Sequence, residues 1–373
     1  MSRGTIIYVG EFFLPDRSAA ANRVVANGKL FSALGYTTVF LGSSEDSFEG
    51  IRKVENCENM YEQSHPETTK QWIEHTLSTK EIIGLADKYT DVRMVVLYNL
   101  PVITLCAVKN ALRGRNIEVI YDCTEWTQST SGSFFKKAFK YVDELAVRRL
   151  AHRIADGMIV ISSLMAENYR KAKKLLLLPP LVDTDDSIWH QPYEEHDGVF
   201  EFCFAGVPDG NKERPDVIVE AFKGIKRDDI RLRIIGITRE KFGRLYPNIG
   251  LAPEEEKKII FMGALSHRQT IRYLLSSNCC VFLRISDRRN NAGFPTKFTE
   301  AHTCGLSVIT TDVSDIKKYM TDKNSGCVLN SVQTQDISAA MLKEAEKGCR
   351  STELKTTFDY KEYTESCEAW LNG

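Results

Sequence analysis

The sequence lacks any hydrophobic run long enough to cross a membrane. Its longest apolar stretch spans residues 175–182, includes two prolines, and falls far below the roughly 18 residues that a spanning helix needs. The apolar run that begins at Ile6 soon meets Glu11, whereas a secretory signal needs a longer apolar stretch before any acid. We therefore expect a cytoplasmic protein that is not exported.

An excess of charge of one sign is also missing. The 49 lysines and arginines nearly balance the 50 aspartates and glutamates, so the formal net charge is -1. This balance argues against holding nucleic acid by bulk charge, and we expect no nucleic-acid partner. The ten cysteines include no C-x-x-C pair and there is no histidine cluster, so we predict reduced thiols and no metal.

Strand and helix patterns alternate through the first half of the chain. Such alternation is typical of a parallel sheet covered by helices. The predicted strands are residues 5–9, 37–41, 94–98, 119–121, 158–162 and 175–178, and the predicted helices are 19–34, 101–113, 134–154 and 165–173. Gly35 stands where the first helix needs a left-handed residue to end. This half therefore reads as one α/β domain.

A polar, irregular stretch from Leu181 to Gly198 separates a second alternating set. Its predicted strands are residues 200–205, 232–235, 259–262, 280–283 and 307–310, and its predicted helices are 215–225, 270–277, 297–303, 315–320 and 360–371. We predict two tandem Rossmann-like α/β domains that face a cleft, with boundaries at 1–183, 184–198, 199–355 and 356–373. Functional residues should then follow the carboxyl ends of the strands.

The most informative segment is a Gly-Phe-Pro-Thr loop that leads into the helix at Lys297. Free N–H groups at a helix start bind anions, and a lysine in that first turn suits a phosphate. Glu300 lies one turn further and has the chemistry to accept hydrogen bonds from a ribose diol. An ordinary capped surface helix is the alternative. The candidate donor-binding residues here are Phe294, Pro295, Thr296, Lys297, Phe298 and Glu300.

This segment resembles the second-domain signature of retaining glycosyltransferases of family 4, which have the GT-B fold. The matching residues are Phe294, Glu300, Ala301, Gly305, Val308 and Ile309. Two positions depart from the motif, because Ala292 replaces its first glutamate and Pro295 replaces the glycine of its Phe-Gly pair. The form Gly-Phe-Pro-Thr-Lys-Phe resembles a subset that acts in bacterial surface-polysaccharide assembly.

The resemblance extends over nearly the whole chain and implies further roles. It places the acceptor on the first domain, the nucleotide sugar on the second, and the C-terminal helix back on the first. Gly206 and Lys212 match the strand-glycine loop that meets the donor diphosphate. In the first domain, Gly10, Asn22 and Arg23 belong to the counterpart of the family's glycine-rich loop and are candidates for phosphate or acceptor contacts. Close helix packing is the alternative for that loop.

Two carboxylates, Asp122 and Glu125, follow a first-domain strand beside Trp126. Carboxylates accept hydrogen bonds from sugar hydroxyls, an indole face stacks on sugar C–H groups, and one acid has the chemistry of a general base. An aspartate that caps a turn is the alternative. With Lys297 and Lys212 as the cations that neutralise the leaving diphosphate, Asp122 and Glu125 complete the predicted catalytic set.

Charge is unevenly distributed despite the neutral total. Residues 133–174 carry ten lysines and arginines against four acids, a local excess of +6. A basic helix with interleaved aromatics can lie on an anionic bilayer, which a lipid-linked acceptor would require. The alternative is a solvated helix whose apolar side faces the core. From this segment we hypothesise that the protein contacts the inner face of a membrane.

We thus expect a metal-independent retaining glycosyltransferase. It would move a sugar from a UDP- or GDP-linked donor to a glycan or lipid-linked acceptor, with no separate cofactor. Two alternatives stay open. The loss of the motif glutamate at Ala292 is compatible with a non-catalytic protein that binds nucleotide sugars or glycans. A sugar-nucleotide epimerase with the same two-domain architecture is the other.

Overall fold

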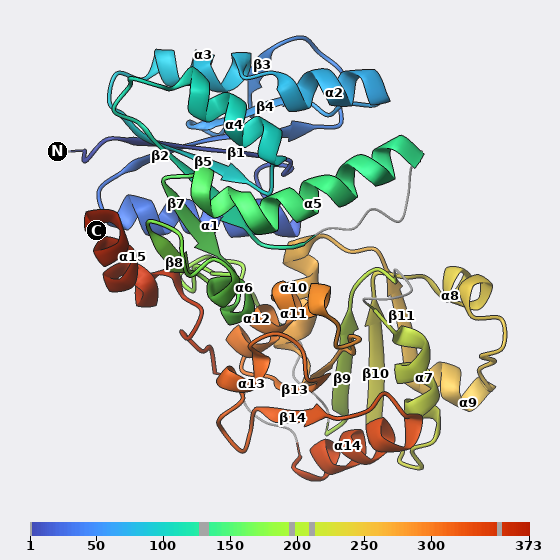
Figure 1. The fold of residues 1–373 in the computed structure, drawn as a ribbon. Coiled ribbons are helices and arrows are strands. Elements are labelled where there is room, and N and C mark those ends of the chain that lie inside the picture. Colours follow the sequence, from blue (N-terminus) through green and yellow to red (C-terminus); the bar gives the residue numbers. More distant parts are fainter. Residues whose placement is uncertain (1, 127–133, 194–197, 209–212, 349–352) are drawn as a thin grey trace. The chain divides into compact units, whose positions relative to one another are not determined.

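The computed structural model describes residues 2–126, 134–193, 198–208, 213–348 and 353–373 (Figure 1). The chain forms two compact units. The first comprises the residues up to Asp183 together with Asp359–Gly373, and the second comprises Thr184–Phe358. Each unit contains one largely parallel sheet with helices, which confirms the predicted pair of Rossmann-like domains.

The sheet of the first unit has eight strands in the order β3-β4-β2-β1-β5-β6-β7-β8. Among the strands described for this sheet, only β3 and β4 pair antiparallel. The strand bounds are β1 Thr5–Gly10, β2 Thr37–Ser44, β3 Ile51–Lys53, β4 Met60–Ser64, β5 Val92–Tyr98, β6 Glu118–Cys123, β7 Gly157–Val160 and β8 Leu175–Leu177. From β1 the chain first builds outward through β2 and then returns to place β5 on the other side of β1. The topological switch point therefore lies between β1 and β5, where such sheets bind ligands.

Helices cover both faces of this sheet, and the C-terminal segment supplies one of them. The helices are α1 Ala19–Ala33, α2 Thr69–Leu77, α3 Lys80–Lys88, α4 Val102–Ala111, α5 Phe134–Ile154 and α6 Ser163–Asn168, followed at the C-terminus by the 3-10 turn η1 Tyr360–Tyr363 and α15 Thr364–Asn372. Ile6 and Tyr8 of β1 share a core with Val24 of α1 and with Cys367 and Trp370 of α15. Figure 1 shows α15, in dark red, beside blue α1. The predicted return of the C-terminal helix to the first domain is confirmed.

The second unit has a six-stranded parallel sheet in the order β11-β10-β9-β12-β13-β14. The strand bounds are β9 Phe200–Ala205, β10 Ile230–Ile235, β11 Ile259–Gly263, β12 Cys279–Val281, β13 Ser307–Thr311 and β14 Gly326–Leu329. The helices are α7 Pro215–Lys223, α8 Arg239–Leu245, α9 Pro253–Lys258, α10 His267–Leu275, α11 Arg288–Ala292, α12 Thr296–Thr303, α13 Ile316–Tyr319 and α14 Thr334–Glu346. After β11 the chain returns and places β12 on the other side of β9. The switch point therefore lies between β9 and β12.

Two properties of the described residues bear on the sequence predictions. None of their helices combines the length and the apolar character that a membrane crossing requires. The nine cysteines among them are all free thiols, and the adjacent pair Cys279 and Cys280 is buried within β12. Burial raises the pKa of the Cys279 thiol, which keeps it protonated.

Candidate active site

Glycines follow three neighbouring strands at the carboxyl edge of the second sheet. Gly206 comes directly after β9, Gly236 after β10, and Gly263 ends β11. A Cβ at Gly236 would lie 2.2 Å from the carbonyl oxygen of Gly206, and its φ of +107° also favours glycine. The absence of side chains lets these strand ends approach closely and leaves the edge open for other groups.

Lys297 reaches this edge from the first turn of α12. Its ammonium lies 5.1 Å from the centre of the Phe204 ring of β9. A Cβ on Gly206 would come within 1.9 Å of the lysine Nζ, so a larger residue there would displace the end of this side chain. The N-cap residue of α12 is Pro295, which supplies no side-chain cap to the helix N–H groups. The predicted combination of a lysine and an uncapped helix start is therefore present.

A carboxylate that the sequence analysis missed holds this lysine. Oε2 of Glu213, just before α7, lies 2.7 Å from Nζ of Lys297, and its Oε1 lies 3.3 Å from Nη2 of Arg284. Arg284 and Lys297 both follow β12, whereas Glu213 follows β9, so the carboxylate meets the two cations across the switch point. Burial lowers the pKa of Lys297, and Glu213 partly offsets this effect. Lys212, the neighbour of Glu213, lies outside the described residues.

The phenylalanines of the Gly-Phe-Pro-Thr-Lys-Phe segment are core residues. Phe294 and Phe298 are buried and contact each other edge to face, at a ring-centre distance of 6.0 Å. Both also contact Tyr319 and Phe358. Their side chains anchor the loop, so a donor contact at Phe294 or Phe298 would have to come from the backbone. Thr296 remains half-buried beside Lys297.

Glu300 lies one turn after Lys297 and is held by a second missed residue. Nε2 of His267, the first residue of α10, lies 2.9 Å from Oε1 of Glu300. Oε2 of Glu300 has no partner within the part of the chain that the structure describes. The two side chains are partly exposed. The local sequence around His267 gives no sign of this role, because the histidine begins a different helix and only the folded sheet brings it close to Glu300.

In the first unit, Asp122 and Arg23 form a buried network. Nη2 of Arg23 lies 3.3 Å from Oδ1 of Asp122, and the Tyr8 hydroxyl donates to Oδ2. Arg23 also donates to the carbonyls of Leu178 and Pro179, and the Asp122 side chain is 0% exposed. In this structure neither residue is accessible to a substrate. The network instead ties α1, β1 and β6 to the segment after β8.

The other predicted residues near Asp122 have different surroundings. Glu125 is exposed after β6, and Asn22 is half-buried in the first turn of α1. Trp126 is buried, donates from Nε1 to the Tyr169 hydroxyl, and has the Arg148 guanidinium 4.9 Å from its ring centre. The predicted stacking of Trp126 on a sugar is therefore wrong, because no indole face is open to a ligand.

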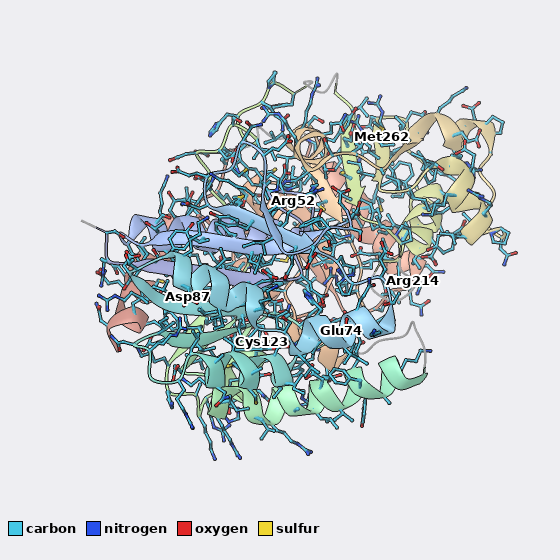
Figure 2. All side chains as sticks on the ribbon, turned by 90° about the horizontal axis from the view of Figure 1, so that it is seen from above. Arg52, Glu74, Asp87, Cys123, Arg214 and Met262 are labelled. Atoms are coloured by element: carbon cyan, nitrogen blue, oxygen red, sulfur yellow. The ribbon has the colours of Figure 1, made fainter. Side chains whose placement is uncertain are left out.

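A pocket of about 260 Å³ lies at the switch point of the first sheet. One side of it is formed by Gly10, which ends β1, by Glu11 after it, and by Leu100 and Pro101 after β5. The opposite side comes from α2 and α3, which the sequence analysis did not predict, and carries Glu74, His75 and Glu81; Figure 2 labels Glu74 on its helix. Burial lowers the pKa of His75, although Glu11 opposes this shift. The imidazole therefore stays neutral at neutral pH.

Each unit thus places a polar site at the switch point of its own sheet, and the second site is basic. Two tandem units of this kind define the GT-B class of folds. The sequence model described as "Glycosyl transferases group 1" matches residues 185–360, which include the Lys297 site. The matched segment spans nearly the whole second unit, so this unit is similar to the group 1 glycosyltransferase domain.

Solved structures share the fold over almost the entire chain. Sucrose-phosphate synthase from Thermosynechococcus elongatus superposes with a TM-score of 0.65 at 13% identity, over 99% of this chain and 98% of that one. Anabaena HepE, solved with UDP and glucose, gives 0.62 at 10% identity and 99% coverage of both chains. UDP-GlcNAc 2-epimerase from Methanocaldococcus jannaschii gives 0.59 at 12% identity, again over 99% of both. No curated protein matches the chain by sequence.

Proposed function

We propose that the protein is a retaining glycosyltransferase that binds the diphosphate of its nucleotide-sugar donor at Lys297. The observation that carries this proposal is the pair of cations, Lys297 and Arg284, at the switch point of the second sheet. Positive charge beside an uncapped helix start suits the diphosphate, which gains negative charge as the sugar leaves. Electrostatic stabilisation of that leaving group would be the main catalytic contribution of these residues.

The proposed reaction exchanges one glycosidic bond for another. The bond between the anomeric carbon and the diphosphate oxygen breaks, and its electron pair goes to the diphosphate. The acceptor hydroxyl oxygen bonds to the anomeric carbon on the same face and releases its proton. Glu125, exposed after β6, is the proposed base because Asp122 is buried. Glu300, with Oε2 available, is proposed to accept hydrogen bonds from the donor ribose. Gly206 and Lys212 complete the proposed diphosphate site.

We further propose the pocket beside Gly10 as the acceptor site. Its volume of about 260 Å³ suits a single sugar ring, and its wall carries carboxylates from Glu11, Glu74 and Glu81. Carboxylates accept hydrogen bonds from hydroxyl groups and repel phosphate or acid groups. The acceptor is therefore proposed to be a neutral sugar at its reacting end. The Gly-Phe-Pro-Thr-Lys-Phe segment supports a role in surface-polysaccharide synthesis in the cytoplasm.

A panel of UDP-, GDP- and ADP-linked sugars tests the function directly. We expect the protein to release nucleoside diphosphate from one donor slowly in water and faster with a glycan acceptor, and the anomeric NMR signals of the product should show retention. Binding of a donor without release would favour the non-catalytic alternative. A new sugar nucleotide formed with no release would favour the epimerase. Either outcome would contradict the proposed function.

We also propose that α5 contacts an anionic membrane surface. Val142 is 64% exposed, and Arg149 and Arg153 follow it on the same helical face at spacings of seven and eleven. Two acids of this helix point to other partners, because Asp143 accepts from the backbone of Val102 and Glu144 pairs with Arg148. The exposed face of α5 therefore carries a larger excess of positive charge than the composition of the whole helix indicates. Phe134, Phe135 and Lys136 have side chains outside the described set.

Flotation with phosphatidylglycerol-containing liposomes at low salt tests this contact. Wild-type protein should float with anionic and not with neutral vesicles. Because each surface cation contributes about 1 kcal/mol, the double variant Arg149→Glu/Arg153→Glu should bind at least about thirtyfold more weakly. The control Lys241→Glu/Arg244→Glu makes the same charge change on α8 and should float like the wild type. Absence of wild-type flotation would contradict the proposal.

A further inference from the structure

Glu213 lies at the centre of the proposed donor site and carries a negative charge, the same sign as the donor's diphosphate. Its carboxylate is 6% exposed and contacts both cations of the site, Lys297 at 2.7 Å and Arg284 at 3.3 Å. These two side chains are themselves only 15% and 14% exposed. A carboxylate in a phosphate site would ordinarily weaken binding, so its presence between the two cations needs a physical reason.

The reason lies in the cost of burying two like charges together. A lysine taken out of water beside an arginine lowers its own free energy by losing its proton. A neutral lysine would then contribute little to binding a diphosphate. Glu213 offsets both the burial and the repulsion, because one carboxylate faces each cation through a different oxygen. The three groups together keep a charge of +1.

The cluster also retains donors that are not used by Glu213. The Lys297 ammonium has three N–H bonds, and it pairs with a single oxygen of Glu213. Nε of Arg284 is buried and has no hydrogen-bond partner within the described residues. The start of α12 has no side-chain cap. Unsatisfied buried donors are costly, so these groups indicate an absent acceptor with several oxygens.

We propose that Glu213 is a positioning residue that orients Lys297 and Arg284 and keeps the lysine protonated for the diphosphate of the donor. This inference rests on the proposed function. Glu213 itself does not touch the donor: the diphosphate accepts hydrogen bonds from the remaining N–H groups while the carboxylate stays between the two cations. Gly206 provides the space, because any larger residue would displace the lysine ammonium.

The surroundings of Lys297 give the expected direction of its titration. The groups that face it are Glu213, Arg284, and the thiols of Cys280 on β12 and Cys203 on β9. Burial lowers the pKa of Lys297, Arg284 lowers it further, and Glu213 raises it. Burial also raises the pKa of both thiols, which remain neutral. Removal of the Glu213 charge should therefore lower the lysine pKa, so that the site loses its charge at a lower pH.

NMR titration of the full chain, with lysine labelled at the ε-carbon, tests this effect without any nucleotide. The Lys297 signal is assigned by its loss in Lys297→Ala. In Glu213→Gln its pKa should fall by at least one unit, whereas in Glu213→Asp, which keeps the charge, it should fall by less. The control Glu344→Gln removes another buried carboxylate that pairs with a lysine, Lys347, and should leave Lys297 unchanged. An unchanged Lys297 titration in Glu213→Gln would overturn the proposal.

Binding of UDP, GDP and ADP at pH 6 and pH 8.5 completes the test. For the diphosphate that binds, Glu213→Gln should lose more affinity at pH 8.5 than at pH 6, because Lys297 loses its proton at a lower pH in this variant. An equal loss at both pH values would show a structural role and overturn the inference. Failure of the wild type to bind any of the three would contradict the proposed function, while the lysine titration would still report on Glu213. Glu213→Asp supplies both readouts if Glu213→Gln does not fold.

Discussion

At the scale of single residues, Gly206 shows how one missing side chain shapes the site. A Cβ there would lie 1.9 Å from the Lys297 ammonium. We expect Gly206→Ala to displace the lysine and to lower kcat/KM for the donor by at least tenfold, while the free energy of unfolding changes little. The control Gly250→Ala adds a Cβ with no atom within 4 Å and should retain activity. Full activity in Gly206→Ala would contradict the described lysine position.

His302 makes a second residue-scale prediction, on stability. It is buried beside Phe298 and Phe358, and burial lowers its pKa to about 4. The unfolded chain binds a proton near pH 6.5 and the folded chain does not, so the unfolding free energy falls as pH decreases from about 6.5 to 4. Up to about 3 kcal/mol is lost over that window. Urea unfolding should show a flatter pH dependence for His302→Phe than for the wild type. Parallel curves for the wild type and His302→Phe would contradict this account.

The local sequence pattern was sufficient to predict Lys297, but it did not predict the residues that surround this lysine. A lysine after Gly-Phe-Pro-Thr, at the start of a helix, is a pattern within one segment. Glu213, Arg284 and His267 carry no such pattern, because each belongs to a different segment and meets the site only after the sheet forms. Asp122 shows the reverse case. An aspartate at a strand end resembles a ligand, and only the structure shows the arginine that covers it.

At the scale of elements, most strands and helices could be predicted because their apolar residues repeat at a clear period. The predicted helix at 134–154 and the strand at 200–205 have the bounds observed for α5 and β9. Residues 42–93 carry short elements with mixed polarity, so β3, β4, α2 and α3 were not predicted. Those helices form one wall of the first-unit pocket. The proposed acceptor pocket of the first unit was therefore harder to predict than the proposed donor site of the second unit.

The buried network of Asp122 makes an element-scale prediction. Asp122→Asn removes the charge that compensates buried Arg23, and loss of one partner of a buried pair costs about 3–5 kcal/mol. Chemical denaturation should show this loss as a lower free energy of unfolding. The control Asp87→Asn, labelled in Figure 2, breaks an exposed pair with Arg115 and should cost less than about 1 kcal/mol. Wild-type stability with lost turnover in Asp122→Asn would instead support a catalytic aspartate.

At the scale of the whole molecule, the same rule of topology locates both sites. In each sheet the chain turns back beside its first strand, β1 or β9, and the polar groups gather at the carboxyl ends next to that strand. The first site carries carboxylates, and the second carries a pair of cations. This difference of charge matches the two substrates that a glycosyltransferase must hold, a hydroxyl-bearing acceptor and a diphosphate-bearing donor.

Calorimetric titration with UDP, GDP and ADP tests the central claim most directly. The account predicts that the wild type binds at least one of these diphosphates and that Lys297→Ala weakens that binding by at least tenfold. If the same lysine meets the charge that develops on the leaving group, kcat/KM of Lys297→Ala should fall by a factor that corresponds to about 2–4 kcal/mol of lost transition-state stabilisation. Lys317→Ala removes an exposed lysine of the same unit and should bind like the wild type. Equal affinity of the wild type and Lys297→Ala, or no binding by the wild type, would contradict the account.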